Sequence, residues 1–228
     1  MSYNTTMDLS KNKDKTALIT LLYLIIMLAV ASIGILNFLE NGDASNFRWV
    51  YGSIFSILLG SIPYLLNRKY NLDVPWILSI LICLALFLHI AGGIFDWYHI
   101  IQGYDHITHF ISGFIVAFLA FTAIYILDRY WSGLHMNTYA MAFMVIIFAM
   151  AMGSTWEIIE FSMDTLLGTN EQFDGLRGTM LDLIFDAIAG ILTAIIGVYL
   201  INKGEMQTLT QNLGKQIDKV LIHKKKKH

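Results

Sequence analysis

The apolar stretch TALITLLYLIIMLAVASIGILNFL, from Thr16 to Leu39, decides the class of fold. It contains no charged residue and is longer than the about 20 residues that a helix needs to cross a bilayer. Five further apolar runs follow, at about residues 47–66, 74–95, 107–127, 139–161 and 179–201. The pattern predicts an all-α polytopic membrane protein with six transmembrane helices.

The composition supports this class. Hydrophobic residues make up 56% of the chain and charged residues 14%, whereas soluble domains average about 25% charged residues. The first apolar run exceeds the about 7–15 residues of a signal-peptide core, so we expect an uncleaved first helix. Cys83 is the single cysteine, which excludes an intramolecular disulfide framework and a zinc–thiolate site.

The distribution of cations predicts the orientation of the helices. Cytoplasmic loops of membrane proteins carry an excess of Lys and Arg. If the N-terminus is cytoplasmic, every Lys and Arg except Arg48 and Arg177 falls on the cytoplasmic side. We therefore expect both termini in the cytoplasm, a multi-pass protein of the plasma (inner) membrane, and three parts: a cytoplasmic segment 1–15, a transmembrane domain 16–201 and a cytoplasmic tail 202–228.

The tail combines apolar residues at helical spacing with a basic cluster, Lys224 to Lys227. Met206, Leu209 and Leu213 begin the apolar series, which predicts an amphipathic helix on the membrane surface. The lysines would attract anionic lipids. A solvated, disordered tail is the alternative. Membrane lipids are the expected partners and no nucleic-acid partner is expected; the sequence does not define an oligomeric state.

Acidic and histidine side chains gather at the ends of three predicted helices that face the non-cytoplasmic side. In each helix two of them are three or four residues apart, so they share one face. The pairs are Asp105 with His109, Glu157 with Glu160, and Asp182 with Asp186. Asp186, Gly190 and Ala194 also form a stripe of small residues, which lets membrane helices approach closely. We therefore expect the three pairs to meet.

Several carboxylates and an imidazole this close together need a bound cation, shared protons or a counter-ion such as Arg177. Carboxylate oxygens with a neutral imidazole suit a divalent metal. In the metal hypothesis the ligands are Asp105, His109, Asp182 and Asp186. Glu157 or Glu160 is then the catalytic general base, and Arg177 and His106 bind the substrate.

Three ordered motifs resemble the YjdF-like family of inner-membrane proteins. They are "YDHITHFISGF" at 104–114, "WEIIEF" at 156–161 and "TMLDLIFDAIAG" at 179–190. The resemblance implies a shared polar set of Asp105, His109, Glu157, Glu160 and Asp182. A more distant similarity is to VanZ-like proteins, which are linked to glycopeptide-antibiotic resistance in the cell envelope. The chain departs from these patterns at Gly178 and at Asp186, where an Asp and an Asn, respectively, would be expected.

The leading functional hypothesis is a cell-envelope protein with an outward-facing site that hydrolyses or transfers a lipid or lipid-linked substrate, using a divalent metal. Intramembrane ionisable residues are functional by default. Two alternatives stay open: an ion- or proton-coupled transporter, and a non-catalytic structural or partner-binding membrane protein. The polar residues do not continue towards the cytoplasmic side, which weighs against a transport path.

Overall fold

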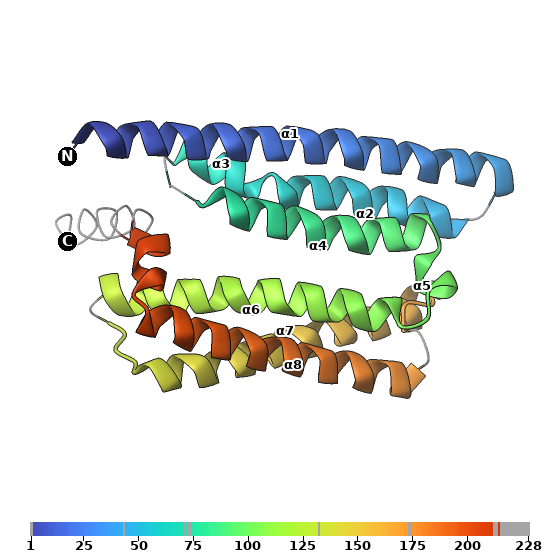
Figure 1. The fold of residues 1–228 in the computed structure, drawn as a ribbon. Coiled ribbons are helices and arrows are strands. Elements are labelled where there is room, and N and C mark those ends of the chain that lie inside the picture. Colours follow the sequence, from blue (N-terminus) through green and yellow to red (C-terminus); the bar gives the residue numbers. More distant parts are fainter. Residues whose placement is uncertain are drawn as a thin grey trace, which may run out of the picture. The chain divides into compact units, whose positions relative to one another are not determined.

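The computed structural model describes residues 2–42, 44–70, 72, 74–131, 133–172, 175–211 and 214. Within these ranges the regular structure is entirely helical, as the sequence predicts. The helices are α1 (Ser2–Asn41), α2 (Ala44–Gly60), α3 (Ile62–Lys69), α4 (Trp76–Ile94), α5 (Trp97–Ile100), α6 (Tyr104–Tyr130), α7 (Thr138–Leu167) and α8 (Gly175–Asn202) (Figure 1).

Six segments of the described chain are long and apolar enough to cross a membrane, which confirms the predicted number. They are Asn12–Asn41, Arg48–Lys69, Trp76–Ile94, Tyr104–Tyr130, Thr138–Leu166 and Gly175–Asn202. The second combines α2 and α3. The helix is interrupted at Ser61 because Pro63, early in α3, has no N–H to continue the hydrogen-bond ladder.

The helices group into two compact units that divide after Tyr104. In the first unit, α1 packs against α2 and α4. Tyr23, Met27 and Trp49 are among the buried residues of its core. Asn12 of α1 donates a hydrogen bond to the carbonyl of Val74, just before α4 begins. This part of the chain contributes none of the paired residues of the predicted site.

The second unit contains α6, α7 and α8, which run in alternating directions (Figure 1). At one end, Tyr125 of α6 and Met141 of α7 belong to a buried apolar cluster. At the other end, α6 and α8 begin and α7 ends. At that end all three helices extend beyond the predicted apolar runs, and Asp105, which precedes the run at 107–127, lies in the first turn of α6.

The chain after α8 turns back onto this unit. Gly204 has a positive φ of 73°, a conformation that glycine adopts at no steric cost. Met206 then lies buried in the same cluster as Tyr125 and Met141. The basic residues Lys224 to Lys227 lie outside the described residues, so the amphipathic tail stays a prediction. So does the orientation of the termini.

Candidate functional site

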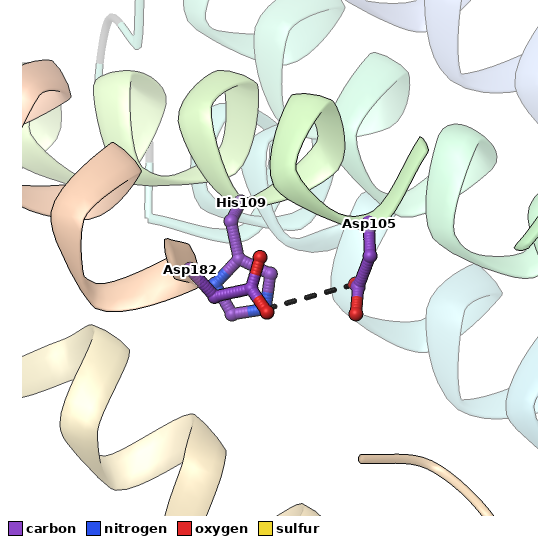
Figure 2. A group of neighbouring side chains, drawn as sticks. All are labelled: Asp105, His109 and Asp182. Carbon is purple, nitrogen blue, oxygen red and sulfur yellow. Dashed lines mark ion pairs between the residues drawn. The ribbon is translucent and has the colours of Figure 1, made fainter. Parts of the chain in front are cut away.

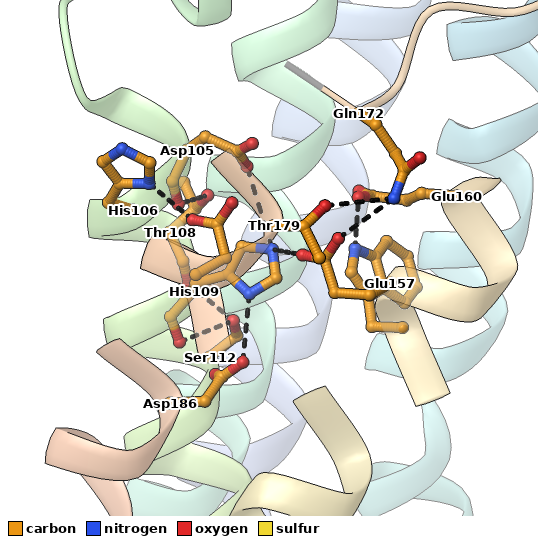
Figure 3. Close-up of polar contacts among 12 residues, drawn as sticks. Asp105, His106, Thr108, His109, Ser112, Glu157, Glu160, Gln172, Thr179 and Asp186 are labelled. Atoms are coloured by element: carbon orange, nitrogen blue, oxygen red, sulfur yellow. Dashed lines mark hydrogen bonds and ion pairs between the residues drawn. The ribbon is translucent and has the colours of Figure 1, made fainter. Parts of the chain in front are cut away.

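The three predicted pairs meet in the interior of the second unit (Figure 3). Each of the six side chains belongs to a residue that is less than a tenth exposed: Asp105 and His109 of α6, Glu157 and Glu160 of α7, and Asp182 and Asp186 of α8. Residues up to 81 positions apart in sequence thus form one buried polar cluster. We call it the His109 cluster, because His109 lies at its centre.

The two ring nitrogens of His109 face different carboxylates. Nδ1 lies 3.1 Å from Oδ2 of Asp186. Nε2 faces the opposite way, 3.6 Å from Oε1 of Glu157 and 3.9 Å from Oδ1 of Asp105. The Asp186 contact is a hydrogen bond, whereas the two contacts of Nε2 are too long for one. His109 is therefore anchored on one side, while its Nε2 makes no hydrogen bond to the described residues although it lies within 4 Å of two carboxylates.

A second histidine of α6 is paired with a second aspartate of α8. His106 Nδ1 lies 2.6 Å from Oδ1 of Asp182. The imidazole of His106 also stacks on the ring of Phe185, with centroids 5.6 Å apart and planes 3° from parallel. The stack and the hydrogen bond together hold the ring and the carboxylate in one orientation.

The two glutamates of α7 differ in how completely their carboxylate oxygens are hydrogen-bonded. Glu160 Oε1 accepts a hydrogen bond of 2.8 Å from the indole N–H of Trp156. Glu157 Oε2 accepts a long one of 3.5 Å from Gln172. Glu157 Oε1 is buried and has no hydrogen-bond partner among the described residues. Because a buried carboxylate oxygen without a hydrogen bond is costly, this atom needs a positively charged neighbour, either a protonated His109 at 3.6 Å or a bound cation.

Two groups of three residues bring ligand atoms close enough to share one ion. They are Asp105, His109 and Asp182 (Figure 2), and His109, Glu157 and Glu160. Within each group the ligand atoms lie within 4.8 Å of one another. Two ligands at about 2.0–2.2 Å on opposite sides of a zinc ion are about 4 Å apart, so small side-chain movements would close either group around an ion. Asp186, predicted as a ligand, belongs to neither group.

Two glycines make room for the carboxylate of Asp186. A Cβ added to Gly113 of α6 would lie 2.6 Å from Oδ1 of Asp186, and one added to Gly153 of α7 would lie 2.1 Å from Oδ2. Both distances are far below van der Waals contact. The sequence predicts a stripe of small residues at Asp186, but no sequence pattern predicts the contact with Gly153, because this contact depends on the rotation of α7 relative to α8.

Arg177 and His106 were predicted to bind substrate. Arg177 is exposed near the start of α8, on the same helix as Asp182. His106 instead contacts Asp182 directly. Gln172, which the sequence analysis missed, reaches Glu157 and also Thr179 at 3.1 Å. No helical periodicity could reveal this contact, because Gln172 lies in the loop between α7 and α8.

That loop is held by Asp164. Its carboxylate accepts hydrogen bonds from the hydroxyl of Thr169 at 2.6 Å and from the backbone N–H groups of Glu171 at 2.7 Å and Gln172 at 3.0 Å. Glu171, which a loop position would place in solvent, is buried. Asp164 therefore fixes the position from which Gln172 reaches the His109 cluster.

Replacing Asp164 with alanine is expected to destabilise the protein by about 2–4 kcal/mol, since hydrogen bonds to a charged group contribute about 1.5–3 kcal/mol each and are not additive. Thermal unfolding in detergent measures this loss. Ser162→Ala is the control, because within the described chain that exposed hydroxyl donates to the carbonyl of Ile158 in its own helix and to no other group. Equal stability of the two variants would contradict the anchoring role.

The fold and the cluster define a class: a helical membrane protein with six candidate spans and a buried group of carboxylates around one histidine. Comparison with protein families gives the particular assignment. The family described as "Predicted membrane protein (DUF2238)" matches residues 18–203. The match covers more than half of the chain, and the protein belongs to this family.

A relative from Thermotoga maritima, described as an uncharacterized protein, is 30% identical over 130 residues. The aligned region covers 57% of this chain and 66% of the relative, which is just under two thirds of that protein's length. No solved structure matches.

Proposed function

We propose that the protein is a divalent-metal-dependent hydrolase or transferase of the cell membrane, with the His109 cluster as its metal site. One observation carries the proposal: Nε2 of His109 lies 3.6 Å from Oε1 of Glu157, a buried oxygen that accepts no hydrogen bond from the described residues. A nitrogen lone pair and a carboxylate oxygen directed at one point are the ligands that a divalent cation prefers.

The electrostatics of the cluster support a cation. Two like charges about 4 Å apart repel by about 4 kcal/mol at an effective dielectric constant of 20. Among the described residues, five buried carboxylates lie around the imidazole of His109, and Arg177 is exposed rather than buried among them. Such a group is stable only if it holds protons or a cation, and a divalent ion neutralises two carboxylates at once.

The two ligand groups suggest a division of roles. His109, Asp105 and Asp182 would hold the ion from α6 and α8. The ion would supply Lewis-acid activation of water or of the substrate. Glu157 and Glu160 of α7 form the second group with His109, and the one outside the coordination shell would accept the proton of the attacking water.

The substrate class follows from the surroundings of the cluster. Apolar side chains of α7, including Ile158 and Phe161, are exposed beside it, as expected for a surface that contacts lipid tails. Arg177 is an exposed cation near the same end of the unit and suits a phosphate or carboxylate group. A lipid or lipid-linked substrate with a polar head would use both surfaces.

Several finer expectations accompany this proposal. They are a plasma (inner) membrane location with the site on the outer face, the YjdF-like and more distant VanZ-like relationship, and binding of anionic lipids by Lys224 to Lys227. A transporter is the main alternative. The second unit weighs against it, because Ala117, Phe121, Val145 and Ala149 form an apolar core along α6 and α7. Cation flux into proteoliposomes would favour the transporter.

The metal content of the purified protein tests the proposal. We expect one or more divalent ions per chain by mass spectrometry, and their loss in the Asp105→Asn/His109→Ala double variant. The matched control is Asp96→Asn/His99→Ala, which disrupts an exposed Asp–His pair in the first unit and should keep the metal. Absence of stoichiometric metal from well-folded wild-type protein, before and after incubation with Zn²⁺, Mn²⁺ or Mg²⁺, would exclude the metal-dependent mechanism.

A further inference from the structure

Two His–Asp contacts connect α6 with α8, one helical turn apart. His106 contacts Asp182 at 2.6 Å. His109 contacts Asp186 at 3.1 Å (Figure 3). In both, the histidine uses its Nδ1 atom and comes from α6, while the carboxylate comes from α8. In one contact the histidine belongs to a candidate ligand group, whereas in the other the aspartate does. This difference assigns a role to each residue.

In the contact between His109 and Asp186, the histidine is the candidate metal ligand. Nδ1 is engaged by Asp186, so Nε2 is the nitrogen that faces Asp105 and Glu157. The carboxylate of Asp186 is 3% exposed as a residue and lies between Gly113 and Gly153. Its position on the far side of the ring fits an acceptor for the Nδ1 proton and not a ligand on the Nε2 side.

In the contact between His106 and Asp182, the carboxylate is the candidate metal ligand. Asp182 belongs to the group with Asp105 and His109, whereas His106 belongs to neither candidate group among the described residues. The stack on Phe185 keeps the His106 ring parallel to that side chain. The hydrogen bond between His106 Nδ1 and Oδ1 of Asp182 thus orients the carboxylate.

We infer that Asp186 and His106 are positioning residues for the metal site, each orienting a ligand on the opposite helix: Asp186 holds His109, and His106 holds Asp182. The inference rests on the proposed function and revises two roles expected from the sequence, a metal ligand for Asp186 and a substrate contact for His106. Partners of this kind fix the orientation of a ligand and raise its basicity, and their loss typically weakens metal binding about 10–100-fold.

The Asp186 contact is tested first without metal. In full-length protein in detergent, ¹⁵N NMR of histidine-labelled samples reports which ring nitrogens of His109 carry a proton, and a His109→Gln sample assigns the signal. We expect a proton on Nδ1 in the wild type, loss of this preference in Asp186→Ala, and its recovery in Asp186→Asn, whose carbonyl oxygen still accepts a hydrogen bond. An Nδ1 without a proton in the wild type would overturn the inference.

Zn²⁺ binding, followed by calorimetric titration, then separates positioning from ligation. We expect Asp186→Ala to weaken binding about 10–100-fold at unchanged stoichiometry and Asp186→Asn to recover most of the affinity. For His106, the Phe variant keeps a ring against Phe185 but lacks the donor, and the Asn variant supplies an amide N–H near the position of Nδ1. We expect His106→Phe to bind weakly and His106→Asn to recover.

The outcomes distinguish the two proposals. Failure of the wild type to bind Zn²⁺, Mn²⁺ or Mg²⁺ would end the proposed function, while the NMR result would still decide whether Asp186 orients His109. If the wild type binds Zn²⁺ and the conservative variants are as weak as Asp186→Ala and His106→Phe, the positioning roles are wrong and the metal site stands. Should Asp186→Ala not fold, the Asp186→Asn and His106 variants complete the same comparison.

Discussion

Divalent metal at about 100 times its dissociation constant is expected to stabilise the wild-type protein by about 2.7 kcal/mol relative to the chelated protein, because an ion that binds only the folded state adds its binding free energy to stability. The physical source is the His109 cluster, whose buried carboxylates repel one another until a cation is bound. Thermal unfolding in detergent, with and without chelator, measures the difference.

Glu157→Gln is the informative variant for this experiment. It keeps the shape of the side chain but removes the charge next to His109 Nε2. Because the repulsion is reduced, we expect the metal-free variant to be at least as stable as the metal-free wild type. It should also lose most of the stabilisation by metal. A variant that gains the full stabilisation would show that Glu157 is not a ligand of the ion, which leaves it only the role of general base.

Replacing Gly153 with alanine is expected to have the second large effect. The new methyl group would lie 2.1 Å from Oδ2 and 2.7 Å from Cγ of Asp186, so the Asp186 side chain must move away from His109. Overpacking of a close contact costs about 1–3 kcal/mol. We expect a loss of stability in this range together with weaker metal binding, since the clash and the loss of the His109 contact have the same cause.

A double-mutant cycle identifies that cause. If Asp186 is the group that alanine at 153 displaces, Gly153→Ala should cost little stability in an Asp186→Ala background, and the coupling energy should lie in the range of about 0.5–3 kcal/mol found for contacting residues. Gly113→Ala, whose methyl group would lie 2.6 Å from Oδ1, should show the same dependence. An equal cost in both backgrounds would contradict the proposed contact.

The sequence by itself determined the membrane class and the number of candidate membrane spans. Long uncharged runs such as residues 16–39 have one stable arrangement in lipid, because a helix satisfies every backbone hydrogen bond internally. The ends of the helices at the cluster were less predictable: α6 begins before the apolar run at 107–127 and includes Asp105. This carboxyl group is buried among polar side chains of other helices, which local hydropathy does not record.

The helical repeat also determined which polar residues share a face, and hence that Asp105 lies with His109 and Asp182 with Asp186. The repeat acts within one helix. It gives neither the rotation of one helix about its axis relative to the next nor their axial offset. Both are decided by packing between side chains distant in sequence, such as Gly153 of α7 against Asp186 of α8.

Only the tertiary structure therefore decided the roles inside the cluster. It placed Asp186 on Nδ1 of His109 and Glu157 on the side of Nε2, and it paired His106 with Asp182. It also placed Met206, which the sequence favours for a surface helix, in the core of the second unit. A sequence can bring ionisable groups to one end of a bundle, but the ring atom that each carboxylate meets depends on distances of a few ångströms between helices.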